Sequence, residues 1–240
     1  MDGLPFCSPI PVAGEDATAL YLVDLDAGNG TMEAFETYLS PSERAHVARL
    51  VRPEQRRRVS ASRGALRAIV AAHLGRPEDQ VEITRDARGK PHAGTGAPGV
   101  SDCLKISCSR SGGLAAIAVS RRYEIGIDVE VPTEMRFPDS LAEFILSPAE
   151  RAAYANTAPA MRTIWLARAW VRKEALLKGI GCGLELEPGA INTVAQTDNP
   201  RGGRSTWSSY RAGGFPRWRL RDVVWEGSVI GIATQPAAHH

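Results

Sequence analysis

The chain spells nearly the same seven residues twice, as LSPSERA at Leu39–Ala45 and as LSPAERA at Leu146–Ala152, 107 positions apart. Taken alone, the heptapeptide has a simple explanation, because Ser, Pro and Glu at these spacings form a common capped start of a helix. Two flanking pairs also match, in the same order: VDLD (Val23–Asp26) with IDVE (Ile127–Glu130), and SRGALRAIV (Ser62–Val70) with RKEALLKGI (Arg172–Ile180). Three matched segments favour an internal duplication over chance.

The duplication predicts an α+β fold of two lobes related by a pseudo-twofold axis, with an N-terminal lobe at residues 1–122 and a C-terminal lobe at 123–240. Alternating apolar residues predict a strand in each lobe, and long helical runs that stop at glycines predict a long helix. The expected elements are strands at Ala19–Ala27 and Glu124–Glu130, helices at Glu54–Leu74 and Met161–Ile180, and hairpins around Gly112-Gly113 and Glu226-Gly227.

Composition narrows the classes of function. The formal net charge is +2, which argues against a general nucleic-acid binder. No apolar run approaches the length of a membrane span, and no secretory signal is visible at the N-terminus. The four cysteines are scattered without C-x-x-C spacing, which is typical of free thiols in a reducing compartment. We therefore expect a cytoplasmic protein with neither a nucleic-acid nor a membrane partner.

Two carboxylates share one face of the strand at Ile125–Glu130. Side chains of a strand alternate between faces, so three apolar residues should point into the core and three others should point away from it. The apolar set is Ile125, Ile127 and Val129, and the other set is Gly126, Asp128 and Glu130. The two carboxylates would lie about 6.6 Å apart along the strand, close enough to serve one cation, and the glycine would leave room for a ligand. A half-buried strand with a solvated acidic face is the competing interpretation.

A second cluster follows on the C-terminal helix, where Trp170, Glu174 and Lys178 lie four residues apart and so line one face. An ordinary surface Glu–Lys pair would explain this spacing. However, the chain has only four lysines against 25 arginines, and Lys173 and Lys178 flank this glutamate. Lysine is a compact charge with an adjustable pKa, which suits contact with phosphate or proton donation.

Three basic segments are weaker candidates for contact with a phosphate. They are the turn RDARGKP (Arg85–Pro91), the small-residue turn SCSRSG (Ser107–Gly112), and the helix with Arg56, Arg57, Arg58, Arg63 and Arg67. Each could contact phosphate oxygens, or be only a solvated loop or helix face. Together with the carboxylates they suggest a Mg²⁺-dependent reaction at a phosphate or diphosphate. No P-loop or dinucleotide-binding glycine motif occurs, and a Ser-His-Asp hydrolase is poorly supported.

These motifs, in this order, resemble the 4′-phosphopantetheinyl transferases of the surfactin-synthetase-activating (Sfp) type. The resemblance runs from about Leu39 to Ala233, and its most specific parts are IGIDVE (Ile125–Glu130) and WVRKEALLKGIGCGL (Trp170–Leu184). It implies two similar α+β lobes with one active site in the cleft between them. It also implies transfer of the phosphopantetheine arm of coenzyme A to a serine of an acyl or peptidyl carrier protein, with release of adenosine 3′,5′-bisphosphate.

Carried over by position, the resemblance assigns Asp128, Glu130 and Glu174 to Mg²⁺. It also implies that Glu174, directly or through a water held near Glu130, is the base that activates the serine, and that Lys178 neutralises or protonates the leaving phosphate. Asp128, Glu174 and Lys178 are thus the expected catalytic residues. The residues expected to bind coenzyme A are His46, Arg58, Arg63, Gly89, Lys90, Pro91, Ser109, Arg110, Lys173 and Lys178. Whether Arg58 or Arg63 contacts the adenosine bisphosphate is left open by gap placement. The first lobe has Gly64 where the second has its glutamate.

The chain departs from the family pattern at two positions. Arg110 replaces the histidine usual between the two serines of the small turn, and Ser107 replaces an asparagine. Both changes concern coenzyme A binding rather than the metal site. The competing hypothesis is a non-catalytic module that binds coenzyme A or a carrier protein. We expect a monomer, because the duplication supplies both lobes within one chain.

Overall fold

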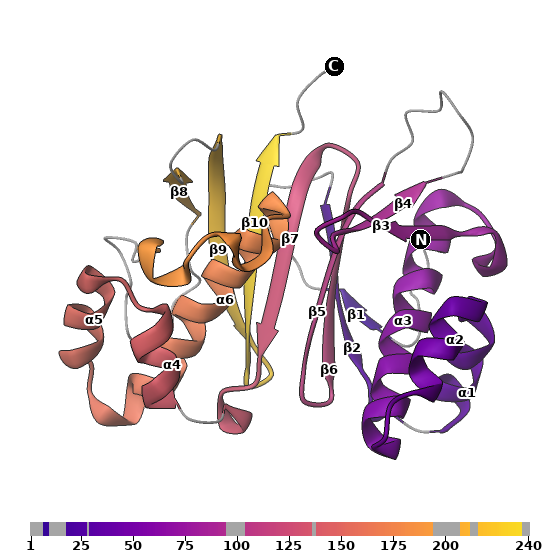
Figure 1. Ribbon diagram of the computed structural model, residues 1–240, viewed down its shortest axis with the longest axis horizontal. Coiled ribbons are helices and arrows are strands. Elements are labelled where there is room, and N and C mark those ends of the chain that lie inside the picture. Colours follow the sequence, from indigo (N-terminus) through magenta and orange to yellow (C-terminus); the bar gives the residue numbers. More distant parts are fainter. Residues whose placement is uncertain are drawn as a thin grey trace. The chain divides into compact units, whose positions relative to one another are not determined.

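The computed structural model describes residues 7–9, 18–27, 29–94, 104–135, 138–193, 207–211 and 216–236. The chain divides into two compact units, Met1–Arg122 and Tyr123–His240. Each unit combines an antiparallel sheet with helices (Figure 1), so the α+β class predicted from the duplication is confirmed. None of the helices in these described ranges is both long and apolar enough to cross a membrane.

The first unit contains a six-stranded sheet in the order β1-β2-β6-β5-β4-β3, in which every neighbouring pair is antiparallel. Its strands are β1 (Cys7–Pro9), β2 (Thr18–Asp24), β3 (Glu82–Arg85), β4 (Pro91–Gly94), β5 (Leu104–Ser111) and β6 (Leu114–Ser120). Its helices are α1 (Asn29–Tyr38), α2 (Pro41–Ala48), α3 (Pro53–Leu74) and the short η1 (Glu78–Gln80). Apolar residues of α3 pack on β2, β5 and β6 to form the core.

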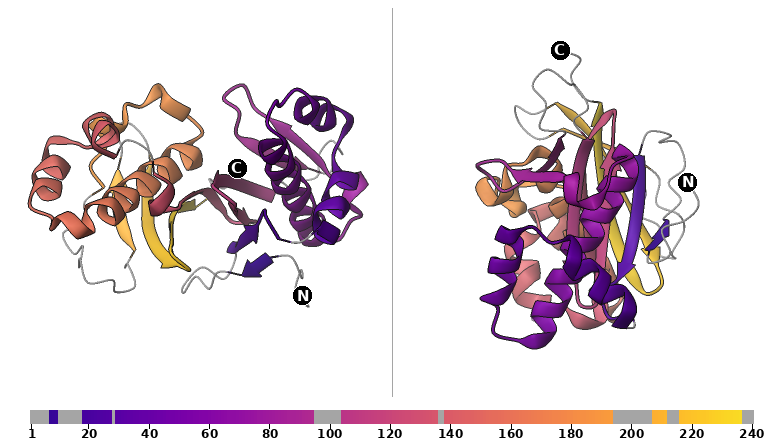
Figure 2. Two further views of the ribbon diagram at one scale, coloured as in Figure 1. Left: turned by 90° about the horizontal axis from the view of Figure 1, so that it is seen from below. Right: turned by 90° about the vertical axis from the view of Figure 1, so that its right-hand side faces the viewer.

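The second unit contains a four-stranded antiparallel sheet in the order β7-β10-β9-β8. Its strands are β7 (Tyr123–Glu130), β8 (Ser208–Arg211), β9 (Arg217–Trp225) and β10 (Ser228–Pro236). Its helices are α4 (Pro138–Ile145), α5 (Pro148–Ala155), α6 (Arg162–Ile180) and the short η2 (Pro132–Glu134), η3 (Pro159–Met161), η4 (Gly183–Glu185) and η5 (Pro188–Ala190). The long helix α6 lies against β7 and β10 (Figures 1 and 2).

The repeated heptapeptides begin equivalent helices, as predicted. The Ser40 hydroxyl accepts from the backbone N–H of Glu43, whose carboxylate accepts from the Ser40 N–H at 2.9 Å. Ser147 and Glu150 repeat both bonds at the start of α5. These reciprocal bonds satisfy backbone donors that a helix start leaves without partners. The two copies are therefore structural caps, one in each unit.

The predicted ends of the long helices and the predicted hairpins are also confirmed. The helix α3 ends at Gly75 and α6 ends at Gly181, with φ of 65° and 76°, a left-handed conformation that favours glycine. The turn at Gly112-Gly113 joins β5 to β6, and the turn at Glu226-Gly227 joins β9 to β10.

Candidate active site

The polar face of β7 is the face on which α6 packs. A Cβ added at Gly126 would lie 1.8 Å from the carbonyl oxygen of Ala175 and 2.5 Å from the backbone nitrogen of Gly179, both on α6. Gly231 on β10 shows the same close approach, with the carbonyl oxygen of Val171 at 2.1 Å. The expectation that Gly126 leaves room for a ligand is therefore wrong, because the helix backbone fills that space.

This close packing brings the two sequence clusters together. Four residues of a helix rise about 6 Å, and two residues of a strand span about 6.6 Å, so side chains at these spacings can meet in successive rows. The indole N–H of Trp170 donates to Glu130 Oε1 at 3.2 Å, and Lys178 Nζ donates to Asp128 Oδ1 at 2.6 Å. Glu174 lies on α6 between Trp170 and Lys178, on the face that meets the strand carboxylates.

The electrostatics of Glu174 reflect this position. Burial is the main cause that raises the pKa of Glu174, and the negative charge of Asp128 raises it further. Lys178 opposes the increase, and Glu130 adds a smaller repulsion. Asp128 itself is only 3% exposed. A half-buried carboxylate whose pKa is raised is a better proton acceptor than an ordinary glutamate.

The three carboxylates have the donor chemistry that Mg²⁺ requires, because all their ligand atoms are oxygens and their mutual repulsion would be relieved by a divalent cation. The arrangement is not a preformed metal site, however. In the part of the chain that the structure describes, no three His, Cys, Asp or Glu side chains are grouped so as to hold a metal ion. Lys178 and Trp170 instead hold Asp128 and Glu130.

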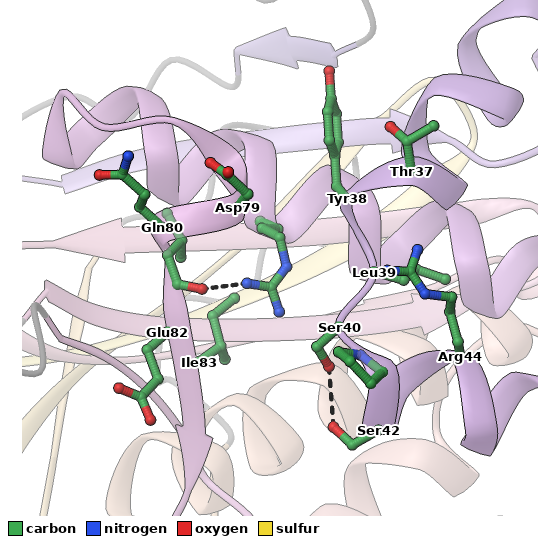
Figure 3. Close-up of a pocket in the computed structure, with 13 residues that line it drawn as sticks. Thr37, Tyr38, Leu39, Ser40, Ser42, Arg44, Asp79, Gln80, Glu82 and Ile83 are labelled. Atoms are coloured by element: carbon green, nitrogen blue, oxygen red, sulfur yellow. Dashed lines mark hydrogen bonds between the residues drawn. The ribbon is translucent and has the colours of Figure 1, made fainter.

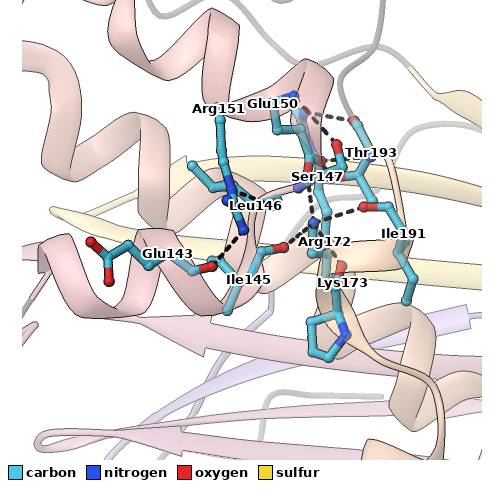
Figure 4. Close-up of polar contacts among 11 residues, drawn as sticks. Glu143, Ile145, Leu146, Ser147, Glu150, Arg151, Arg172, Lys173, Ile191 and Thr193 are labelled. Atoms are coloured by element: carbon cyan, nitrogen blue, oxygen red, sulfur yellow. Dashed lines mark hydrogen bonds and ion pairs between the residues drawn. The ribbon is translucent and has the colours of Figure 1, made fainter.

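Lys173 does not lie in this site. Its side chain is fully buried, and its ammonium contacts Glu150 and three backbone carbonyls (Figure 4). We expected Lys173 to bind coenzyme A, but an enclosed ammonium with all its donors engaged does not fit direct contact with a phosphate. The physical reason is its position on α6, one residue from Glu174 and so about 100° around the helix from it.

In the first unit, Arg58 is engaged in ion pairs. Its guanidinium lies 2.6 Å from Asp26 and 2.8 Å from Glu54. The hydrogen bond from Arg58 is the main cause that lowers the pKa of Asp26. Asp26 occupies the position that matches Glu130 in the duplication. The first unit therefore neutralises this carboxylate with an arginine, whereas in the second unit the matching carboxylate belongs to the candidate site.

Arg63 has different surroundings. Burial is the main cause that lowers its pKa, Glu43 opposes the shift, and the positive charges of Arg85 and Arg110 lower it further. These three arginines come from α3, β3 and β5. Because their charges act on one another, the fold must bring them close together. Arg85 is not one of the residues expected to bind coenzyme A, although it begins the turn RDARGKP, because the sequence does not show that this turn lies close to α3.

The basic turn after β3 is built around Asp86, another residue that the sequence did not single out. Asp86 Oδ1 accepts from the N–H groups of Arg88 at 2.9 Å and Lys90 at 3.0 Å, and Gly89 takes a φ of 85°. These hydrogen bonds therefore fix the backbone conformation at Lys90 and the buried Pro91. Of the other expected contacts, Ser109 lies on β5 and His46 is exposed on the last turn of α2.

A hollow of about 490 Å³ opens elsewhere in the first unit (Figure 3). It lies between the end of α1, the start of α2 and the segment from η1 to β3, and Arg67 lines it together with Ser40 and Asp79. None of the residues expected to bind coenzyme A lines this hollow.

The fold and the site together define a two-unit α+β protein in which one unit carries three carboxylates and a lysine suited to phosphate chemistry. The family model of the 4′-phosphopantetheinyl transferase superfamily matches residues 124–233, and that of the 4′-phosphopantetheinyl transferase N-terminal region matches residues 29–122. The chain belongs to the 4′-phosphopantetheinyl transferase superfamily.

Individual relatives agree with this family. The 4′-phosphopantetheinyl transferase HetI of Nostoc is 32% identical over 70% of this chain and 70% of its own length. The 4′-phosphopantetheinyl transferase AcpT of Salmonella typhimurium is 33% identical over 42% of this chain. The L-aminoadipate-semialdehyde dehydrogenase-phosphopantetheinyl transferase of Xenopus laevis is 26% identical over 60% of it. The chain matches about half the length of the latter two relatives, 50% and 54% respectively.

Proposed function

We propose that this protein transfers the 4′-phosphopantetheine arm of coenzyme A to a serine hydroxyl of an acyl or peptidyl carrier protein. The observation that carries the proposal is the meeting of Asp128 and Glu130 on β7 with Glu174 and Lys178 on α6. Carboxylates that can share a cation, beside a lysine, are suited to a diphosphate substrate. Membership of the transferase superfamily supports the same reaction.

In the proposed mechanism, the Glu174 carboxylate accepts the proton of the carrier serine as the serine oxygen bonds to the β-phosphorus of coenzyme A. The position of Glu174 on the face of α6 that meets the strand carboxylates, between Trp170 and Lys178, suits this role. The bond from that phosphorus to the bridging oxygen breaks, and Lys178 neutralises or protonates the departing adenosine 3′,5′-bisphosphate. Mg²⁺, held by Asp128, Glu130 and Glu174, would supply charge neutralisation at the diphosphate.

The adenosine bisphosphate end of coenzyme A is assigned to residues of the first unit. Arg63 is favoured over Arg58, because Arg58 already pairs with Asp26 and Glu54, whereas Arg63 shares its surroundings with other arginines. The remaining proposed contacts are His46, Gly89, Lys90, Pro91, Ser109 and Arg110. Among these, Lys90 is supported by its place on the turn that Asp86 organises.

The finer classification is part of the proposal. The motifs quoted above favour the Sfp type, and with it carrier domains of nonribosomal peptide or polyketide synthesis in secondary metabolism. We further propose a cytoplasmic monomer. The scattered cysteines and the internal duplication support these two assignments.

The direct test is incubation of the protein with coenzyme A, Mg²⁺ and apo carrier proteins from several pathways, followed by intact mass measurement of each carrier. The expected result is a gain of one phosphopantetheine. Glu174→Ala and Asp128→Ala should each abolish the gain while circular dichroism stays native. Glu143→Ala, which changes an exposed glutamate on α4, serves as the matched control and should keep the activity.

A different outcome would support the competing hypothesis. If no carrier gained mass while isothermal titration still detected coenzyme A binding, the protein would be a binding module that kept the fold without the reaction. Near-normal turnover of either the Glu174 or the Asp128 variant would refute the assignment of the site, even if the wild-type protein were active.

A further inference from the structure

The ammonium of Lys173 is the centre of a buried polar network in the second unit. Lys173 Nζ lies 2.5 Å from Glu150 Oε2, 2.9 Å from the carbonyl oxygen of Pro188 and 2.7 Å from that of Ile191, and it also donates to the carbonyl of Ile145. Neither Lys173 nor Glu150 has exposed side-chain surface. One charged atom of α6 thus ties together the end of α4, the start of α5 and the segment around η5 (Figure 4).

Glu150 completes the network. Its Oε1 accepts from the backbone N–H of Thr193 at 2.8 Å and from the Thr193 hydroxyl at 3.0 Å. Its Oε2 accepts from the N–H of Ser147 in the capping box as well as from Lys173. A buried ion pair whose remaining donors and acceptors are also satisfied holds its elements in one arrangement, because any displacement leaves a buried charge without partners.

The first unit provides an internal comparison. There the capping-box carboxylate of Glu43 is bound by Arg67 at 2.8 Å, and Arg67 also donates to the carbonyl of Val81. The duplication sets Gly64 of α3 opposite Glu174 of α6. The two cations do not occupy matching positions, because the duplication sets Arg63 opposite Lys173 and Arg67 lies one helical turn further along α3. Both units nevertheless bind the capping-box carboxylate with a buried cation of the long helix, and only in the second unit is that cation next to a carboxylate in the sequence.

We propose that Lys173, together with Glu150, is a positioning residue for Glu174, and not a contact for coenzyme A. The proposal rests on the transferase function proposed above. The network fixes one flank of α6, and the contacts of Gly126 with Ala175 and Gly179 fix the flank on β7. Held on both flanks, the helix cannot rotate about its axis, so Glu174 stays directed at the strand carboxylates.

The experiment compares Lys173→Met, Glu150→Gln and the double variant in the carrier-loading assay, well below the midpoint of thermal unfolding. We expect kcat to fall about 10- to 100-fold in each single variant, with the KM for coenzyme A within about twofold of wild type. The double variant should lose much less than the product of the two single losses, because the pair acts as a unit. Should Lys173→Met fail to fold, the milder Thr193→Val, which removes one hydrogen bond to Glu150, should lower kcat in the same direction.

Arg67→Met is the control, because it breaks the pair that binds the capping-box carboxylate of the first unit. It should lower the unfolding midpoint while kcat stays near the wild-type value. The proposal is overturned if Lys173→Met raises the KM for coenzyme A with kcat intact, which would indicate direct binding. It is equally overturned if the Lys173, Glu150 and Thr193 variants lose only stability, as Arg67→Met does. A wild-type protein that loads no carrier would remove the proposed function itself, whereas an active wild type leaves only the positioning role in question.

Discussion

Lys178 Nζ lies 2.6 Å from Asp128 Oδ1 and thereby joins the last turn of α6 to β7 close to the C-terminal end of that strand. The carboxylate is almost fully buried, while the lysine side chain keeps 30% of its surface exposed. The pair thus connects the interior of the second unit to its surface. A cation in this position can leave the carboxylate for an incoming phosphate at a smaller cost than a fully buried one, because part of its hydration is kept.

The first prediction concerns this lysine. Lys178→Met should lower kcat for carrier loading about 100-fold, because the departing bisphosphate loses the group that neutralises it. Steady-state kinetics with an apo carrier protein would measure the effect. Lys105→Met, the same change on β5 of the first unit, should leave kcat near wild type. A Lys178→Met protein with wild-type kcat would remove Lys178 from the chemistry.

The second prediction tests the contact between helix and strand. Gly126→Ala should lower the free energy of unfolding by about 1–3 kcal/mol, because the new Cβ would overlap the Ala175 carbonyl and push α6 away from β7. Transfer activity should fall with it, since Glu174 moves with the helix. Urea unfolding followed by circular dichroism would measure the stability. Gly189→Ala is the control, because its nearest neighbour is 3.4 Å away. Equal stability of the two variants would contradict the prediction.

The repeat made much of the fold predictable. Ser and Glu of each heptapeptide predict the start of a helix from sequence neighbours alone, and in the structure they form the reciprocal hydrogen bonds of a capping box. The glycines that end α3 and α6 and those in the hairpins are local signals of the same kind. The meeting of Asp128 and Glu174 was expected from the family resemblance, because neither a strand pattern nor a helix pattern says which element lies opposite.

The errors came from burial, which local patterns do not determine. Alternation separated the two faces of β7 correctly, but it could not show that the face with Gly126 and Asp128 would be covered by a helix, since both faces are buried. The rarity of lysine marks Lys173 as unusual, yet the role of Lys173 depends on carbonyl groups 15 to 28 residues away along the chain. A rare residue type signals that a position matters without showing whether the reason is chemistry or packing.

The third prediction separates two arginines of α3. Arg63→Ala should raise the KM for coenzyme A about 10- to 100-fold, the effect of losing a hydrogen bond to a charged group. Arg58→Ala should leave that KM nearly unchanged and lower stability slightly, because it breaks the partly exposed pair with Asp26. Steady-state rates of each variant, measured against coenzyme A concentration at a constant carrier concentration, would give the two KM values. If Arg58→Ala raised the KM for coenzyme A more than Arg63→Ala did, the phosphate contact would be assigned to Arg58 instead.

The fourth prediction is a dependence of stability on pH that originates in the first unit. Burial raises the pKa of Glu43, but hydrogen bonds from the Ser40 N–H and from Arg67, with the charge of Arg67, outweigh it, and the net pKa is lowered. Arg63, which lies on α3 like Arg67, adds a further positive charge near Glu43. A carboxyl whose folded pKa lies below its ordinary value of 4.5 stabilises the fold fully above that pH. The contribution is then lost as the pH falls through the folded pKa.

The free energy of unfolding of wild type minus that of Glu43→Gln should therefore be constant near neutral pH and should shrink as the pH falls below about 4.5. Urea unfolding at a series of pH values from 7 to 3, on a denaturant scale corrected for each pH, would measure this difference. In an Arg67→Met background, the decline should be smaller, because losing the main cation that favours the ionised carboxylate raises the folded pKa toward that of the unfolded chain. A difference that stays constant down to pH 3 in both backgrounds would mean that the Glu43–Arg67 pair does not lower the pKa of this carboxyl.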